Sequence, residues 1–402
     1  MRVRLGPAFG WLWTAHALST YGTWIAFGAF PFLAIRELHA SAFAVSLLEA
    51  AGLAVAAFAA VPLGPWVERR AKRPVMVAMD LVRFVAMASV PAAYALGLLS
   101  FGQLLVVSVV SGTAGIAFAA ASGAYLKYLV DADRLLVANG RFEGTNWLAT
   151  AAGPPLGGAL VGLVGPVVTV AANAVGYLLS ALAVLRVGGG DTATPRPRST
   201  DLLSGWRHIL HDRVLRRLFL NAMAVNGLIM ATGPLLAVLL LGRYELPAWQ
   251  YGLAFGVPAL GGFAGARLSA RLVARHGRPR VLTASGWLRS IFPLGLALTG
   301  PGIPGLLVVI VVETLVIASM GVFNPVGATE RLLRTPADRA AQVISAWSIS
   351  SRLAQAAFMV VWGVLATFTG PRAAIAVSGV LLLATPLLLP KRAHLPAPAP
   401  PG

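Results

Sequence analysis

The residue best placed for chemistry is a carboxylate inside a long apolar run. Glu313 sits near the middle of such a run, in the sequence Val311-Val312-Glu313-Thr314. An ionised group is costly to keep in apolar surroundings, so a charge at this depth points to function. The carboxyl could shuttle a proton or bind a cationic substrate. The alternative is a protonated side chain that hydrogen-bonds within the packing.

Two further charges interrupt apolar runs in the same way. Glu49 lies in an early run and could take the same roles as Glu313. Arg352 lies about midway through a late run. It could serve as the counter-ion of Glu313 or as the site for an anionic substrate.

A third group of ionisable residues is less decisive. Glu143 and Arg141 lie near the start of one run, where a structural pair with Asp80 or Arg83 competes with a transport role. His16 could relay protons, because histidine titrates near neutral pH. A hydrogen-bonded structural role for His16 stays open.

The sequence lacks the residue sets that most enzymes need. It has no cysteine, so disulfides, thiolate metal sites and a cysteine nucleophile are excluded. His208 and His211 have no acidic ligand placed to complete a metal site, and no Gly-x4-Gly-Lys-Ser/Thr loop is present. We therefore expect no enzyme activity, no cofactor and no bound metal.

The composition predicts a membrane protein. The 402 residues are 57% hydrophobic and only 11% charged, whereas soluble domains carry about 25% charged residues. Backbone inside lipid must form helices or closed barrels, and these apolar runs are continuous rather than alternating. We therefore predict an all-α protein of about twelve spans, at 9–35, 42–66, 75–97, 103–126, 138–162, 167–186, 214–241, 248–273, 281–299, 304–328, 342–368 and 372–389.

The net charge of +18 falls in alternate loops. One set of loops is rich in arginine and lysine, while the other holds only Arg36, Arg243 and Arg372. Positive residues collect on the cytoplasmic side, so both termini are predicted to be cytoplasmic. The clusters suit anionic lipid headgroups, and nucleic acid is not expected as a partner.

A polar segment divides the chain near its middle. We predict an N-terminal six-helix bundle at 1–187, a linker at 188–213, a second bundle at 214–390 and a Pro-rich cytoplasmic tail at 391–402. Leu202 to Arg213 has the pattern of an amphipathic helix lying on the inner leaflet.

The two bundles resemble each other in sequence. Four features recur in order about 205 residues later: Pro31 as Pro234, Arg83 as Arg289, Asp133-Arg134 as Asp338-Arg339, and Gly165-Pro166 as Gly370-Pro371. Two parallel sets of six helices are a transporter architecture, with substrate handled near the midplane.

Two motifs resemble the major facilitator superfamily. Gly64, Glu68, Arg69 and Arg73 resemble its cytoplasmic gate motif, with Glu68 where aspartate is usual. Gly64 would allow close helix approach, and Glu68 could pair with Arg73 to hold the cytoplasmic side shut. Asp80 and Arg83 follow early in the third span, and a plain positive loop is the alternative reading.

The second motif is similar to the exporter-type glycine motif of that superfamily, Gly-Pro-x-x-Gly-Gly. It consists here of Gly153, Pro154, Gly157 and Gly158, with Ala149 where an earlier glycine is usual. Glycines allow tight helix packing, and proline kinks the helix.

The stretch Leu126 to Asn139, with Asp131 and Asp133-Arg134, and the sequence Asp80-Leu81-Val82-Arg83 most resemble one branch of this superfamily. That branch, of the major facilitator fold, includes the enterobactin exporter and macrolide-efflux-type permeases. It implies a monomeric, proton-coupled exporter in the bacterial inner membrane, working by alternating access. The fourth span lacks the arginine that many proton-driven members carry. The expected substrate is a bulky amphipathic molecule, such as a drug or a siderophore-like metabolite. Alternatives are a lysophospholipid translocator of the same fold and a non-transporting receptor or enzyme.

The resemblance also implies which spans line the cavity. In this superfamily the first and seventh spans do so, which nominates Tyr21, Trp24, Phe27, Asn221 and Asn226. We therefore expect a pocket that tolerates aromatic substrates.

Overall fold

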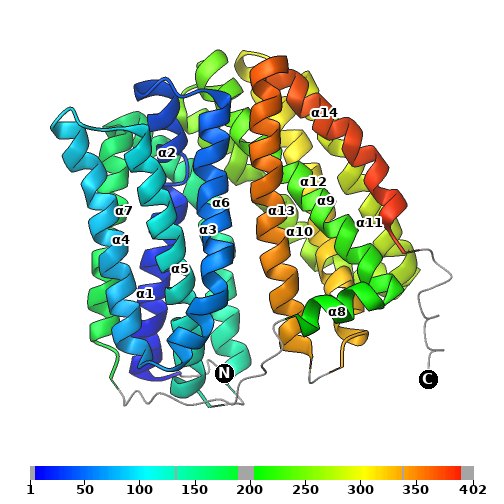
Figure 1. Cartoon of the computed structure of the whole chain (residues 1–402), viewed down its shortest axis with the longest axis horizontal. Helices are drawn as coiled ribbons and strands as arrows, with labels where there is room; N and C mark the ends of the chain where they lie inside the picture. Colours follow the sequence, from blue (N-terminus) through cyan, green and yellow to red (C-terminus); the bar gives the residue numbers. More distant parts are fainter. Residues whose placement is uncertain (1–4, 132–133, 189–202, 337–338, 391–402) are drawn as a thin grey trace. The chain divides into compact units, whose positions relative to one another are not determined.

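The computed structural model describes residues 5–131, 134–188, 203–336 and 339–390. The chain divides into two compact units (Figure 1). Unit 1 comprises Met1–Ala40, Ala51–Arg198 and Pro247–Gly256. Unit 2 comprises Ser41–Ala50, Ser199–Leu246 and Val257–Gly402. Each unit therefore includes a short piece of the other predicted bundle. The predicted bundle and linker boundaries remain a proposal, and the tail at 391–402 lies outside the described residues.

The first half of the chain forms seven α-helices and one π-helical turn. They are α1 (Gly6–Ile25), α2 (Ala29–Phe32), η1 (Leu33–Glu37), α3 (Ala42–Glu68), α4 (Lys72–Ala95), α5 (Phe101–Leu129), α6 (Leu135–Val164) and α7 (Pro166–Leu185). The first predicted span is broken between α1 and α2, just before Pro31, which has no backbone N–H to continue the helix.

The second half repeats this order after one short helix. The elements are α8 (Ser204–His211), α9 (Arg213–Ala237), η2 (Val238–Arg243), α10 (Ala248–His276), α11 (Arg278–Ile291), η3 (Phe292–Leu298), α12 (Gly302–Leu333), α13 (Ala340–Thr369), α14 (Pro371–Ala384) and η4 (Thr385–Leu388).

Twelve of these helical segments are long and apolar enough to cross a membrane, which confirms the predicted fold class. The helix pairs that pack most closely also correspond. In unit 1 they are α4 with α7, α1 with α7, α1 with α6 and α4 with α5. In unit 2 they are η3 with α14, α9 with α14, α9 with α13 and α11 with α12. The internal repeat in the sequence is thus a repeat of helix packing.

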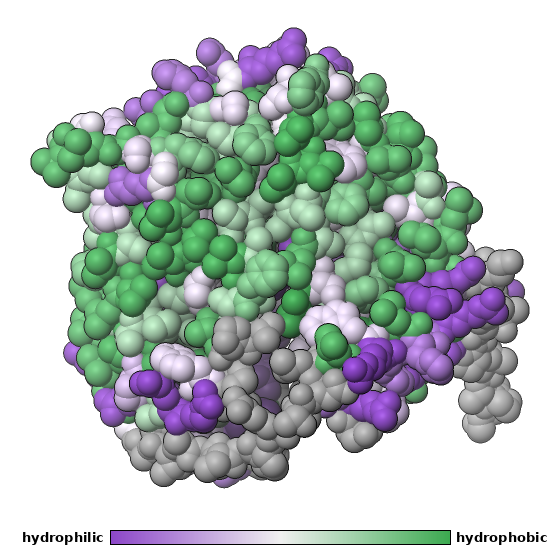
Figure 2. All heavy atoms as spheres, viewed as in Figure 1, coloured by the Kyte–Doolittle hydropathy of each residue, from purple (hydrophilic) through white to green (hydrophobic). Residues whose placement is uncertain are grey.

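Hydrophobic side chains dominate the middle of the helices on the face shown in Figure 2, and hydrophilic side chains gather toward the helix ends. Exposed apolar side chains are numerous on α7, for example Val175, Leu179 and Leu182. Such a surface suits a lipid environment, where exposed apolar residues carry no penalty.

The predicted amphipathic helix of the linker is present as α8, and part of its apolar face packs on protein. Helix α8 crosses the ends of longer helices (Figure 1) and packs on α13 and α9. Ile209 is fully buried there, and Trp206 Nε1 donates to Ser350 Oγ at 2.9 Å. A Cβ at Gly205 would overlap with the carbonyl of Gln342. Because Gly205 permits this approach, one side of the helix packs on protein, while Leu203 and Leu210 stay exposed. Contact of the exposed side with the inner leaflet remains a prediction.

Candidate functional site

A polar cavity of about 330 Å³ opens within unit 1 between α1, α4, α5 and α6. Its volume falls in the range of small-molecule sites. Its lining mixes charged, amide, hydroxyl and aromatic groups: His16, Ser19, Thr20, Thr23, Trp24, Arg83, Gly115, Phe118, Ala119, Ser122, Gly123, Leu126, Asn139, Phe142, Glu143 and Asn146. Four of the sequence-predicted residues, His16, Trp24, Arg83 and Glu143, are thereby brought together.

Arg83 makes the side-chain hydrogen bonds that hold one wall of this cavity together. Its Nη1 donates to Ser19 Oγ at 2.8 Å, and its Nη2 donates to Tyr177 Oη at 2.8 Å and Thr23 Oγ1 at 3.3 Å. The guanidinium also lies 3.8 Å from the centre of the Tyr177 ring, a cation–π contact. Arg83 thus joins α1, α4 and α7.

Asp80 balances this arginine from one helical turn earlier on α4. Its Oδ1 lies 3.5 Å from Arg83 Nη1, and the Asp80 side chain is fully buried. The carboxylate also faces Ser180 on α7. A buried cation that is paired in this way is tolerated because its charge is compensated.

The opposite wall comes from α6, on which Asn139, Glu143 and Asn146 recur at helical spacing. The His16 ring packs on the Phe142 ring, with centroids 4.3 Å apart, and faces the Asn146 side chain. The Glu143 side chain is exposed, and no described residue pairs with it. Glu143 is thus available to a ligand in the cavity.

The glycine motif brings α6 against α1. A Cβ at Gly153 would overlap with Trp24, and a Cβ at Gly157 would overlap with the carbonyl oxygen of Ile25. Gly158 makes a similarly close approach to the Ala248 carbonyl at the start of α10. Only glycine fits such backbone contacts. The motif therefore fixes the helix that carries Glu143.

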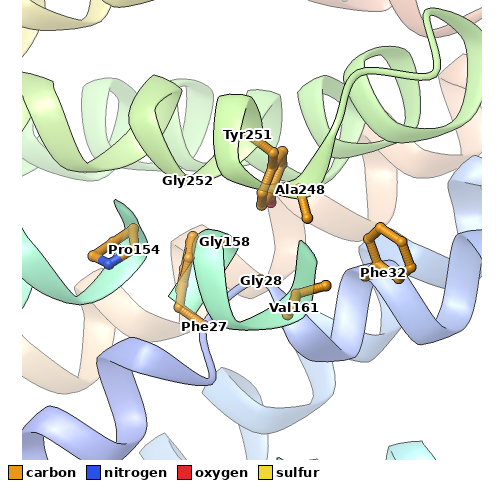
Figure 3. A pocket seen from close by; sticks show the side chains of 9 residues that line it. All are labelled: Phe27, Gly28, Phe32, Pro154, Gly158, Val161, Ala248, Tyr251 and Gly252. Carbon is orange, nitrogen blue, oxygen red and sulfur yellow. The ribbon is translucent and has the colours of Figure 1, made fainter. Parts of the chain in front are cut away.

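A second, much smaller cavity lies at the break between α1 and α2 (Figure 3). Its volume is about 10 Å³, enough for one water molecule. Phe27, Phe32, Pro154 and Tyr251 point into it from α6, α10 and both sides of the break. The candidate Phe27 is therefore part of aromatic packing that also includes Phe255, with the Phe27 and Phe255 ring centroids 5.7 Å apart. This space is too small for a substrate.

The predicted gate motif is only partly described. Gly64 and Glu68 belong to α3, but their side chains lie outside the described residues, so their pairing stays a prediction. Arg69 is exposed. Arg73 donates to the backbone carbonyls of Val184 and Leu185 at the end of α7. A cation at this position stabilises the negative end of the helix dipole.

The two intramembrane glutamates, Glu49 and Glu313, both belong to unit 2. Each is partly exposed, and neither forms a hydrogen bond or ion pair with a described residue. Glu49 lies close to Gly233 on α9, whose Cβ would sit 4.0 Å from Glu49 Oε2. Carboxyl groups without a fixed partner at this depth are suited to gain and lose a proton.

The other candidates in unit 2 are separated. Arg352 is exposed on α13 and pairs with no described residue, so the proposed Glu313–Arg352 pair is absent among the residues described. Asn226 Nδ2 donates to Ser351 Oγ at 3.3 Å. Tyr21, in unit 1, is partly exposed on α1 and is not part of either cavity.

Asn221 does not line a cavity wall as expected, because it is buried at 1% exposure. Its Oδ1 accepts from Arg289 Nη2, and its Nδ2 donates to the Thr385 carbonyl at 2.8 Å. The Arg289 guanidinium also covers the Phe323 ring, 3.4 Å from its centre. The Asn221 amide is buried because it accepts the hydrogen bond of Arg289, and this is why it does not line a cavity as predicted.

Several cavity residues were not anticipated from the sequence, among them Phe118, Asn139, Phe142 and Asn146. Tyr177, which anchors Arg83, was also missed. A useful signal existed on α6, where Asn139, Glu143 and Asn146 share one helical face in an otherwise apolar run. The hydrogen-bond partners of Arg83, Ser19, Thr23 and Tyr177, come from other helices, so no local pattern identifies them.

Sequence comparison identifies the family to which the chain is similar. The family model described as Major Facilitator Superfamily matches residues 12–329 and 230–402. The multidrug efflux pump Tap of Mycobacterium tuberculosis is 28% identical over 312 residues, covering 73% of this chain and 70% of that protein. Tap of Mycobacterium bovis gives the same values.

Solved structures share the fold at much lower sequence identity. A mutant of the nucleoside transporter NupG superimposes with a TM-score of 0.78 and 11% identity, covering 96% of this chain and 99% of that one. A bacterial homologue of the iron transporter ferroportin gives 0.77 and 16%, with coverage of 94% and 98%. The repeated bundles, the twelve spans and the family match together show that this chain belongs to the Major Facilitator Superfamily, and is a membrane transporter and not an enzyme.

Proposed function

We propose that this protein is a secondary-active exporter of bulky amphipathic small molecules, such as drugs or siderophore-like metabolites. Protons drive it, and it works as a monomer by alternating access. It resides in the bacterial inner membrane with both termini in the cytoplasm. The likeness to the multidrug efflux pump Tap supports the direction and the substrate class.

The observation that carries this proposal is the cavity in unit 1. It combines aromatic rings on α1, α5 and α6 with hydroxyl, amide and charged groups. A lining that mixes aromatic rings with hydrogen-bonding groups suits molecules that have a flat apolar body and polar substituents.

Proton coupling is assigned to Glu313 and Glu49. Neither carboxyl is held by a cation among the described residues. A carboxylate that is locked into an ion pair resists protonation, whereas an unpaired one inside a membrane span is easily neutralised. Closure of the cytoplasmic side is assigned to the Gly64–Arg73 motif, including Glu68.

The test is dye and drug transport by purified protein in liposomes under an imposed pH gradient. We expect gradient-driven transport by the wild type and its loss in Glu313→Gln, Glu49→Gln or both. Glu37→Gln is the matched control, because Glu37 is exposed at the end of η1. Transport by wild type and both variants alike would remove these residues from the coupling mechanism.

The same liposomes distinguish the lysophospholipid alternative. A fluorescent lysophospholipid is supplied in place of the drug panel, with loss of fluorescence on chemical quenching reporting its leaflet. We expect no protein-dependent movement of the lipid. Movement of lysolipid without movement of any drug would replace the export proposal with lipid translocation.

A further inference from the structure

The charges around the unit 1 cavity define a narrower substrate class, an inference that rests on the proposed export function. We infer that the cavity selects flat aromatic molecules with one protonated amine, which binds Glu143, and an uncharged hydrogen-bond acceptor, which binds the Ser19 hydroxyl. Asp80 makes the cavity reject the same molecules when they carry a carboxylate.

The first step concerns the cationic wall. Arg83 borders the cavity, but the Asp80 carboxylate 3.5 Å from its Nη1 already balances its charge. Its Nη atoms are engaged by Ser19, Thr23 and Tyr177. A ligand at this wall therefore contacts hydroxyl groups, and the Asp80–Arg83 ion pair behind them carries no net charge. The Thr23 hydroxyl donates to the Ser19 backbone carbonyl at 2.8 Å. The Ser19 hydroxyl accepts from Arg83 and keeps its own hydrogen, which it can donate to a carbonyl or ether oxygen without requiring a negative charge.

The second step concerns the histidine. His16 Nε2 is buried and has no hydrogen-bond partner among the described residues. An imidazolium would need an acceptor for each of its two N–H groups. The ring also packs against Phe142, with the two ring planes tilted by 32°. His16 therefore contributes a neutral, largely apolar surface to the cavity.

The third step identifies the one charge that is left. Glu143 faces the cavity from α6, is exposed, and has no ion pair with the residues described. Arg141, two residues earlier, directs its guanidinium toward Phe9 and Trp13. The cavity thus carries one unbalanced negative charge, which favours a single positive charge on the ligand.

The spacing of the polar groups sets the shape of the ligand. Phe142 packs on His16, so the adjacent Glu143 lies near the level of His16 on α1. Ser19, whose hydroxyl can donate to the ligand, follows at roughly 5 Å along the axis of α1. Trp24, Phe118 and Phe142 supply aromatic surface around this interval. A fused aromatic body carrying an amine at one end and a carbonyl at the other spans such a distance.

The experiment uses three naphthalimide dyes that differ only in their side arm. The first carries a tertiary amine, the second carries the amine and an added carboxylate, and the third carries a neutral acetamide. Uptake of each dye is measured with full-length protein in inside-out proteoliposomes. We expect the wild type to transport the amine dye with the lowest KM and to exclude the dye with the carboxylate.

Variants at Glu143 test the amine site. Glu143→Gln should raise the KM of the amine dye roughly tenfold, the value of one charge-assisted hydrogen bond, and leave the acetamide dye unchanged. Glu143→Lys should reverse the preference and admit the carboxylate. Because Glu143 is exposed, both variants are expected to fold.

A variant at Asp80 tests the exclusion. Asp80→Asn keeps the side-chain shape and releases the charge of Arg83, so transport of the carboxylate dye should appear. Asp131→Asn, an exposed acidic residue after α5, is the matched control and should not gain it. If Asp80→Asn does not fold, the Glu143 variants decide the question.

The outcomes separate this inference from the export function. Equal transport of the amine and carboxylate dyes by the wild type overturns the inference but leaves export standing. An equal effect of Glu143→Gln on all three dyes also overturns it. Absence of transport of any dye by the wild type counts against the proposed function itself.

Discussion

Two buried arginines occupy corresponding positions in the two units, and their surroundings differ. Arg83 in unit 1 has Asp80 one turn away and borders a cavity. Arg289 in unit 2 is 1% exposed, and position 286, which corresponds to Asp80, is a glycine. Among the described residues Arg289 has an amide and an aromatic ring as its partners. The same position in the repeat therefore carries a compensated charge in one unit and an uncompensated one in the other.

This difference indicates that the two arginines have different roles. In unit 1, the Asp80–Arg83 ion pair borders the polar cavity and can determine which charged ligands bind there. An arginine enclosed by Asn221 and Phe323 instead connects α11 to α9 and α12. Three stability measurements on purified protein in detergent test this comparison.

The largest effect is expected for Arg83→Met. It leaves the Asp80 carboxylate buried without its cation, which costs about 3–5 kcal/mol of unfolding free energy. Thermal unfolding followed by circular dichroism measures the loss. The double variant Asp80→Asn/Arg83→Met should recover at least half of it. Equal losses of unfolding free energy in the single and double variants would show that the Arg83 charge does not stabilise the buried Asp80 carboxylate.

The next effect concerns the glycines that follow the same repeat. Gly157→Ala places a methyl group on the Ile25 carbonyl and should cost about 1–3 kcal/mol through overpacking. Gly162→Ala on the same helix is the control, because its Cβ would meet nothing within 4 Å. Denaturant unfolding at matched detergent concentration measures both.

The corresponding glycine in unit 2 sharpens this test. A Cβ added at Gly363 would lie 2.7 Å from the Cβ of Ser46. The nearest atom is thus part of a side chain, whereas at Gly157 it is a backbone carbonyl oxygen. The added variant Ser46→Gly should therefore restore part of the stability that Gly363→Ala loses, with Phe43 Cα still 3.3 Å from the new methyl group. No single side-chain truncation should rescue Gly157→Ala. A rescue of Gly157→Ala by such a truncation would mean that the backbone contact is not the cause.

The smallest effect is expected for Arg289→Met. The change leaves Asn221 Oδ1 without its donor, but it also removes a buried cation that has no carboxylate. These terms oppose each other, and we expect a loss of about 1 kcal/mol. Arg275→Met, at an exposed residue of α10, is the control for loss of a charge. A loss as large as that of Arg83→Met would show that Asp80 does not account for the difference between the units.

The sequence predicted the fold because the bilayer leaves few alternatives. Continuous apolar runs have to become helices there, and alternating loop charge fixes how many there are. The equivalence of Arg83 and Arg289 was also visible as a repeat. The break in the first span was not predicted, since Pro31 and Gly28 suggest a bend without locating it.

The site was predicted less completely than the fold. Glu143, His16 and Trp24 were identified because charged, imidazole and aromatic groups stand out in apolar runs. The use of Asn221 was predicted wrongly, because a single amide in a span looks the same whether it faces a cavity or a buried arginine. Tyr177 was missed because its role depends on contact with Arg83, 94 residues away in the chain.

Helix α12 sets a limit on the membranes that suit this protein. Its 32 residues extend about 48 Å, against a hydrocarbon thickness of about 30 Å. Its polar end holds the buried Glu330, with Arg278 at 3.7 Å and Arg334 at 3.8 Å. A thicker bilayer would draw these charges toward the lipid tails at an energetic cost. The ion pairs at this end therefore favour a bilayer thin enough to leave them outside the hydrocarbon region.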